Sequence, residues 1–112
     1  MASSNEALDN FSKYVLDSDP NLRFSLGVSS PSELSEKLAL QVARRAIGIA
    51  GDAGLTQQAD EVGRAISQGR LSEAIGLSER IHIQVRPENE GSLFGTVFQS
   101  ITSGGHEEHH EL

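Results

Sequence analysis

The chain of 112 residues has 16 acidic and 9 basic side chains, a net charge of −7, and no cysteine. This balance disfavours nucleic-acid and anionic-membrane partners, which require a basic surface, and the lack of cysteine excludes disulfides and thiolate chemistry. The sequence has neither a long apolar run nor a basic-then-apolar start, so we expect no transmembrane helix, no secretory signal and a cytoplasmic location.

The first predicted helix covers about residues 4–17. Ser3 and Glu6 have the spacing of a capping box, in which each side chain accepts a backbone N–H at the start of a helix. Apolar side chains then recur at helical spacing, at Leu8, Phe11, Tyr14 and Val15. Pro20 ends this helix and can begin a short second turn, and residues 22–26 are compatible with either strand or helix.

The clearest helix start in the chain is at Ser30-Pro31, with Glu33 three residues after the serine. It predicts a helix over about residues 31–50, closed by Gly51 and Gly54, after which Thr56 can cap the next helix. The apolar stripe is formed by Leu34, Leu38, Val42 and Ile49, with Ala39, Ala43, Ala46 and Ala50 beside it. Arg44 and Arg45 mark its polar flank.

Residues 57–84 predict two short amphipathic helices joined by a turn at Gly69, where glycine suits a left-handed helix cap. The apolar stripe is formed by Ala59, Val62, Ala65 and Ile66 and then by Leu71, Ala74, Ile75, Ser78 and His82. Residues 81–86 also alternate as a strand would, but the helical stripe favours helix to about residue 84, before the break at Pro87. We expect His82 to be half-buried on a helix face.

A last apolar helix is predicted over residues 90–102, carrying Phe94 and Phe98 and weakened by Gly91 and Gly95. Together these segments predict an all-α fold, a small bundle of four or five short helices with the helix-turn-helix hairpin at its centre. We expect a single helical domain over residues 1–102 and a disordered His/Glu-rich tail over residues 103–112, dispensable for folding.

The hairpin over residues 57–87 resembles a single, degenerate tetratricopeptide repeat. The matching positions are Ala59, Val62-Gly63, Ala65-Ile66, Gly69, Leu71, Glu73-Ala74-Ile75 and Pro87. The aromatic residues usual in that family are replaced by Ala59, Ile66 and Ser78. The resemblance implies a protein-binding role, and it implies that neighbouring helices cover the repeat, because one such unit cannot bury its own apolar face.

Residues 4–55 show a fainter resemblance to the nitrogen-fixation-type leader peptides of ribosomally made natural products. It rests on Ser4, Leu8, Phe11, Val15, Asp19, Leu22, Leu26, Ala46, Ala50 and Ala53-Gly54-Leu55. The resemblance implies recognition by modifying enzymes and cleavage after a double glycine, which Gly104-Gly105 would supply. The seven residues that follow contain no Cys, Ser or Thr to modify.

The segment from His106 to His110 matches the H-E-x-x-H pattern of zinc metalloproteases. That chemistry needs a packed helix and a third ligand, whereas here a Ser-Gly-Gly segment precedes the motif and the chain ends at Leu112. We therefore expect at most weak, adventitious zinc or nickel binding through His106, His109 and His110, and no resident cofactor.

No catalytic constellation is apparent elsewhere, so we do not expect an enzyme. The acidic residues lack the spacing of a paired-carboxylate or calcium site, and no phosphate-cradling loop or nucleophile elbow is present. The sequence favours a non-enzymatic protein-interaction or adaptor module, or a subunit of a larger assembly, with another protein or a second copy as partner. The candidate partner-binding residues are Leu71, Ile75, Phe94, Phe98, Arg44 and Arg45. The alternatives are the leader peptide and the tail-based metal binder.

Overall fold

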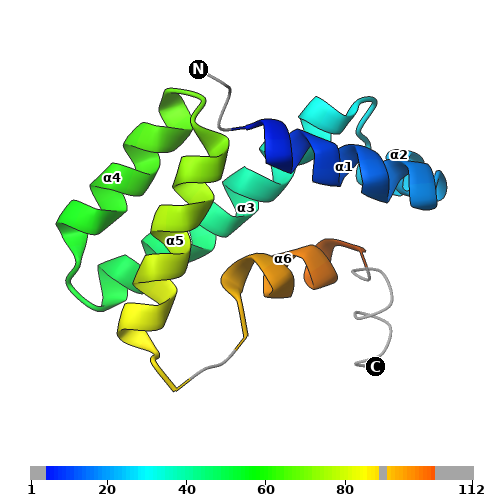
Figure 1. The fold of residues 1–112 in the computed structure, drawn as a ribbon. Coiled ribbons are helices and arrows are strands. Elements are labelled where there is room, and N and C mark those ends of the chain that lie inside the picture. Colours follow the sequence, from blue (N-terminus) through cyan, green and yellow to red (C-terminus); the bar gives the residue numbers. More distant parts are fainter. Residues whose placement is uncertain (1–4, 89–90, 103–112) are drawn as a thin grey trace.

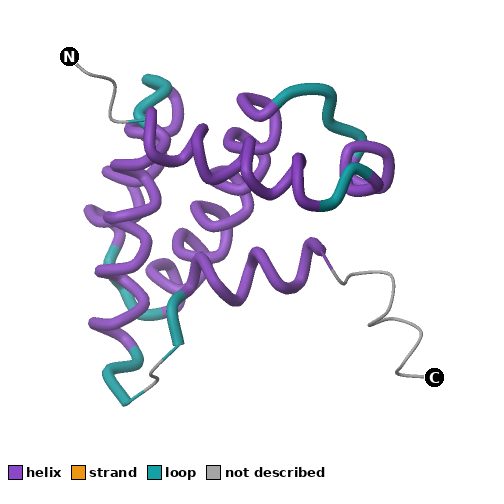
Figure 2. The backbone as a smooth tube through the Cα atoms, turned by 45° about the vertical axis from the view of Figure 1, so that its right-hand side comes forward, coloured by secondary structure: helices purple, strands orange, loops and turns teal. Residues whose placement is uncertain are grey.

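The computed structural model describes residues 5–88 and 91–102, and these residues form helices joined by short loops (Figures 1 and 2). The all-α fold class is confirmed. Six helices lie within the described ranges, one more than the largest number predicted. They are α1 (Glu6–Ser18), α2 (Asn21–Leu26), α3 (Pro31–Asp52), α4 (Thr56–Ser67), α5 (Leu71–Val85) and α6 (Leu93–Thr102).

The additional helix is α2, which resolves the ambiguity at residues 22–26. Pro20 is at its N-cap, with the helical φ of −58°, and Gly27 closes it in the left-handed conformation at φ 69°. The start predicted for α1 was wrong, because Asn5 is at the N-cap and makes no capping bond within its own helix. Ser3, the first half of the predicted capping box, is outside the described residues.

The start predicted for α3 is confirmed, since Ser30 Oγ accepts the Glu33 backbone N–H at 3.3 Å. The Glu33 carboxylate reaches back to the Ser29 N–H at 2.8 Å, one residue before the position that a capping box uses. The helix continues two residues beyond its predicted end, and Gly54 closes the turn with φ 77°. Thr56 is not the cap of α4, because the helix begins at Thr56 and Leu55 is at its N-cap.

The hairpin forms as predicted from α4 and α5, which lie side by side in Figure 1. Gly69 has φ 75°, and the Arg70 N–H bonds to the Ala65 carbonyl at 2.9 Å in a Schellman-type turn. Residues 81–85 are helical, so the strand alternative is excluded. The last helix begins at Leu93 rather than at residue 90, because Gly91 and Ser92 precede it outside helical geometry.

Two apolar clusters make up the core, and α3 runs through both. The first joins α3 to the hairpin and α6, and its buried members are Val42, Ala43, Ala46, Ala50, Val62, Ile81, Leu93 and Val97. The second joins α3 to α1 and α2, and its buried members are Val15, Leu16, Val28, Leu34 and Leu38. Phe94 and Ile101 of α6 pack against both clusters. The last helix therefore connects the two halves of the core.

Candidate functional site

An open apolar groove of about 370 Å³ lies where α1, α5 and α6 meet. In Figure 1 these three helices lie on one side of the long α3. The residues that line the groove are Ala7, Leu8, Phe11, Ser72, Ile75, Gly76 and Phe94. None of them is charged, so the surface of the groove suits an apolar side chain rather than an ion.

Three phenylalanine rings support the α1–α6 side of the groove. The Phe11 ring meets Phe94 and Phe98 edge-to-face, with centroid distances of 5.6 and 5.4 Å, and Phe94 and Phe98 stack at 6.3 Å. The backbones of α1 and α6 do not approach each other closely, so large side chains bridge the space between them. Edge-to-face packing fixes the ring orientations and gives this wall of the groove a defined shape.

Two small residues in the lining, Ala7 of α1 and Gly76 of α5, leave the groove open. Gly76 is in the middle of α5, and a Cβ atom added there would meet no heavy atom within 4 Å. Ala7, on the exposed face of α1, adds only a methyl group. The opening thus follows from one small residue on α1 and one on α5, beside the larger apolar side chains that line the rest of the groove.

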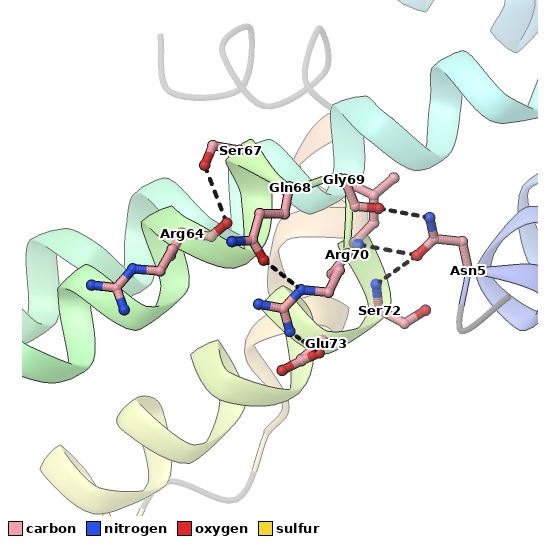
Figure 3. A network of polar contacts seen from close by, with 9 residues as sticks. Asn5, Arg64, Ser67, Gln68, Gly69, Arg70, Ser72 and Glu73 are labelled. Atoms are coloured by element: carbon pink, nitrogen blue, oxygen red, sulfur yellow. Dashed lines mark hydrogen bonds and ion pairs between the residues drawn. The ribbon is translucent and has the colours of Figure 1, made fainter. Parts of the chain in front are cut away.

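Asn5 fixes α1 against the turn of the hairpin, as Figure 3 shows. Its Nδ2 donates to the Gly69 carbonyl at 2.9 Å, and its Oδ1 accepts the N–H groups of Leu71 and Ser72 at 3.0 and 3.2 Å. Arg70, at the N-cap of α5, provides no side-chain cap. Asn5 therefore satisfies the first free donors of α5 from the other side of the groove.

Glu79 fixes α6 in a similar way. Its two carboxylate oxygens accept the N–H groups of Leu93 and Phe94 at 2.9 and 2.8 Å. These are charge-assisted bonds at the positive end of a helix, the location where a carboxylate stabilises a helix most. Glu79 thus places Phe94, the α6 residue that lines the groove, against α5.

The hydrogen bonds from Asn5 to Gly69, Leu71 and Ser72 form what we call the Asn5 bridge, and a second depression of about 300 Å³ lies on its other side. Its lining combines three carboxylates with apolar side chains and contains no Lys or Arg; it consists of Asn5, Asp9, Ser32, Glu33, Glu36, Leu40, Ile66, Gly69 and Leu71. We call it the acidic depression. It adjoins the groove, because Leu71 lines the depression and Ser72, the next residue, lines the groove.

The residues predicted to bind a partner fall into three places. Ile75 and Phe94 line the groove, and Phe98 supports it through the ring cluster. Leu71 lines the acidic depression. Arg44 and Arg45 are exposed on α3 and line neither hollow. The tail histidines His106, His109 and His110 are outside the described residues.

Sequence reasoning missed Asn5, Glu79, Gly76 and the position of Phe11 in the groove. Phe11 was placed on an apolar stripe, but nothing in the sequence pairs that stripe with the last helix. Arg70 does not cap α5 with its side chain, but α2 and α4 also begin without a side-chain cap, so this absence is not a signal of a distant cap.

Four polar side chains are buried within the described part of the chain: Ser12, Ser35, Ser78 and His82. Ser12 and Ser35 are fully buried and share a hydrogen bond of 2.9 Å, and Ser35 donates to Asp9 at 2.7 Å, which ties α1 to α3. His82 is 8% exposed, more buried than predicted, and its Nδ1 has no hydrogen-bond partner among the described residues. No group of three or more potential metal ligands occurs in the described ranges.

The chain matches no family model, and no match was found among curated proteins or among solved structures. The tetratricopeptide-like and leader-like resemblances therefore stay predictions. Among the helices of residues 5–88 and 91–102, none is both long and apolar enough to cross a membrane.

Proposed function

We propose that the protein is a non-enzymatic interaction module that holds an apolar segment of a partner protein in the α1–α5–α6 groove. The observation that carries this proposal is the groove itself, which is open, uncharged and lined by large apolar side chains against a glycine. Recognition of an amphipathic helix by an apolar groove is a common use of such a surface.

The way the groove is built supports the proposal. Asn5 and Glu79 each cap a helix from a different helix, so the three walls are held in place by hydrogen bonds as well as by apolar packing. A pre-arranged surface loses less conformational freedom on binding than a surface that must first be ordered. The groove can therefore contribute affinity despite its modest size.

Gly76 offers a way to block the groove without removing any core contact. In Gly76→Gln a side chain would project from α5 into open space at the groove, and glutamine is a better helix former than glycine. Gly48→Gln is the matched control. Gly48 is also an exposed helical glycine where an added Cβ atom would meet no heavy atom within 4 Å, and it does not line the groove.

The test is affinity capture from the lysate of the source cells, followed by reconstitution with the purified partner. We expect wild type and Gly48→Gln to retain the same partner and Gly76→Gln to lose it, with unchanged circular dichroism in all three. Equal retention by Gly76→Gln, or the lack of any partner that rebinds after purification, would contradict the proposal.

A further inference from the structure

We infer that the partner segment is a basic amphipathic helix, whose apolar face fills the groove and whose Lys or Arg side chains reach the acidic depression. This inference rests on the proposed function and specifies the chemistry of the partner. The groove and the acidic depression adjoin each other beside the Asn5 bridge.

The two hollows share a border made by the first turns of α1 and α5. Leu8 lines the groove, whereas the next residue, Asp9, lines the acidic depression. On α5, Leu71 and Ser72 divide in the same way. A segment lying in the groove at this end therefore comes next to the depression, and the long side chains of Lys and Arg can extend from one into the other.

The charges along this border have one sign. The acidic depression contains Asp9, Glu33 and Glu36, the groove contains no charged residue, and neither lining contains a basic residue. The hollows between α4 and its neighbours differ, since Arg64 accompanies Asp60 in one and Glu61 in another. The hollows beside α4 contain both charges, so the purely acidic charge beside the groove is not a general property of this surface.

The three carboxylates also differ in their availability. Asp9 accepts a hydrogen bond from Ser35, and Glu33 accepts bonds from Ser29. Glu36 is exposed and makes no hydrogen bond or ion pair within the described part of the chain. We assign Glu36 as the principal contact for a partner cation.

The apolar part of the depression supports a long basic side chain rather than a bare ion. Leu40, Ile66 and Leu71 lie beside the carboxylates, and Leu40 is 38% exposed. A Lys or Arg side chain can lay its methylene groups on these residues while its charged end meets Glu36. The net charge of −7 also makes a second copy of this chain a poor occupant.

Binding of synthetic peptides, measured by fluorescence anisotropy, tests this inference. The probes are two labelled peptides of about 16 residues with the same leucine stripe at helical spacing, one with Lys and one with Glu at the remaining charged positions. We expect the Lys peptide to bind at least about tenfold more tightly, with affinity falling as salt rises. Equal binding of the two peptides would overturn the inference.

Charge-reversing substitutions of single carboxylates show which of them contacts the Lys peptide. Glu36→Lys should weaken binding of the Lys peptide several-fold, whereas Glu61→Lys, an exposed site on α4 that lines neither hollow, should have a much smaller effect. Equal effects of the two variants would mean that only overall charge attracts the peptide, which would also overturn the inference.

Peptide binding to Gly76→Gln distinguishes a failure of this inference from a failure of the proposed function. If Gly76→Gln weakens binding of both peptides but the charge variants do not differ, the groove binds and the basic preference is wrong. If Gly76→Gln weakens neither, the groove is not the binding site and both proposals fail. Sedimentation of wild type as a dimer that Gly76→Gln dissociates would assign the groove to a second copy instead.

Discussion

Asn5 is an N-terminal cap for a helix that begins 66 residues later in the chain. The usual capping residue immediately precedes its helix, so that closing the bond orders very little chain. Here the bond from Asn5 to Leu71 joins α1 to the hairpin and contributes both to the start of α5 and to the docking of α1. A single amide side chain thus links local and long-range structure.

Replacing Asn5 with alanine should lower the free energy of unfolding by about 1–2 kcal/mol, because the N–H groups of Leu71 and Ser72 lose their acceptor. Asn10→Ala is the control, since Asn10 is exposed on the same helix. Urea unfolding followed by circular dichroism measures the free energy of unfolding of both variants. A loss no larger than that of Asn10→Ala would show that the Asn5 bridge contributes little to stability.

Two glycines of the hairpin should respond in opposite ways to alanine. Gly69→Ala should cost about 1–2 kcal/mol, because φ 75° is unfavourable for a residue with a Cβ. Gly76→Ala should instead stabilise the protein by about 0.5–1 kcal/mol, because Gly76 is inside a helix and its surroundings are open. Thermal melts of the two variants measure the direction of each stability change. A change in the same direction for both would contradict the different roles given to Gly69 and Gly76.

At the scale of the helices, α6 is held by Glu79 as well as by its apolar face. Glu79→Ala should leave the first N–H groups of α6 without their carboxylate and lower stability by about 1–2 kcal/mol. Hydrogen exchange should show the largest loss of protection in α6. The control is Glu61→Ala on α4, and a uniform loss of protection over all helices would mean that Glu79 does not act specifically on α6.

Local patterns predicted most of the helices, because spacing, caps and turn glycines act within a few residues. Ser30-Pro31 and Gly69 located the start of α3 and the turn of the hairpin for this reason. The groove was only partly predictable: Ile75 and Phe94 were identified as apolar residues, but their meeting with Phe11 depends on how three helices pack. Long-range caps such as Asn5 depend on that same packing and have no sequence signature.

At the scale of the whole molecule, α6 connects two apolar clusters that otherwise share α3. Ile101 packs against both clusters, as does Phe94. Loss of contacts at such a position affects both halves, so the arrangement favours a single cooperative unfolding transition. This coupling adds to the coupling through α3, which runs through both clusters, and through the Asn5 hydrogen bonds between α1 and the hairpin.

Ile101→Ala tests this coupling, because Ile101 packs against both clusters and does not line the groove. We expect a loss of about 2 kcal/mol, at the low end for this substitution since Ile101 is only half-buried, with hydrogen exchange in α1 and α5 accelerated by similar factors. Ile83→Ala is the control, because Ile83 is 57% exposed and belongs to neither cluster. Faster exchange in only one half of the molecule would show that the two clusters unfold separately, and α6 would then belong to that half alone.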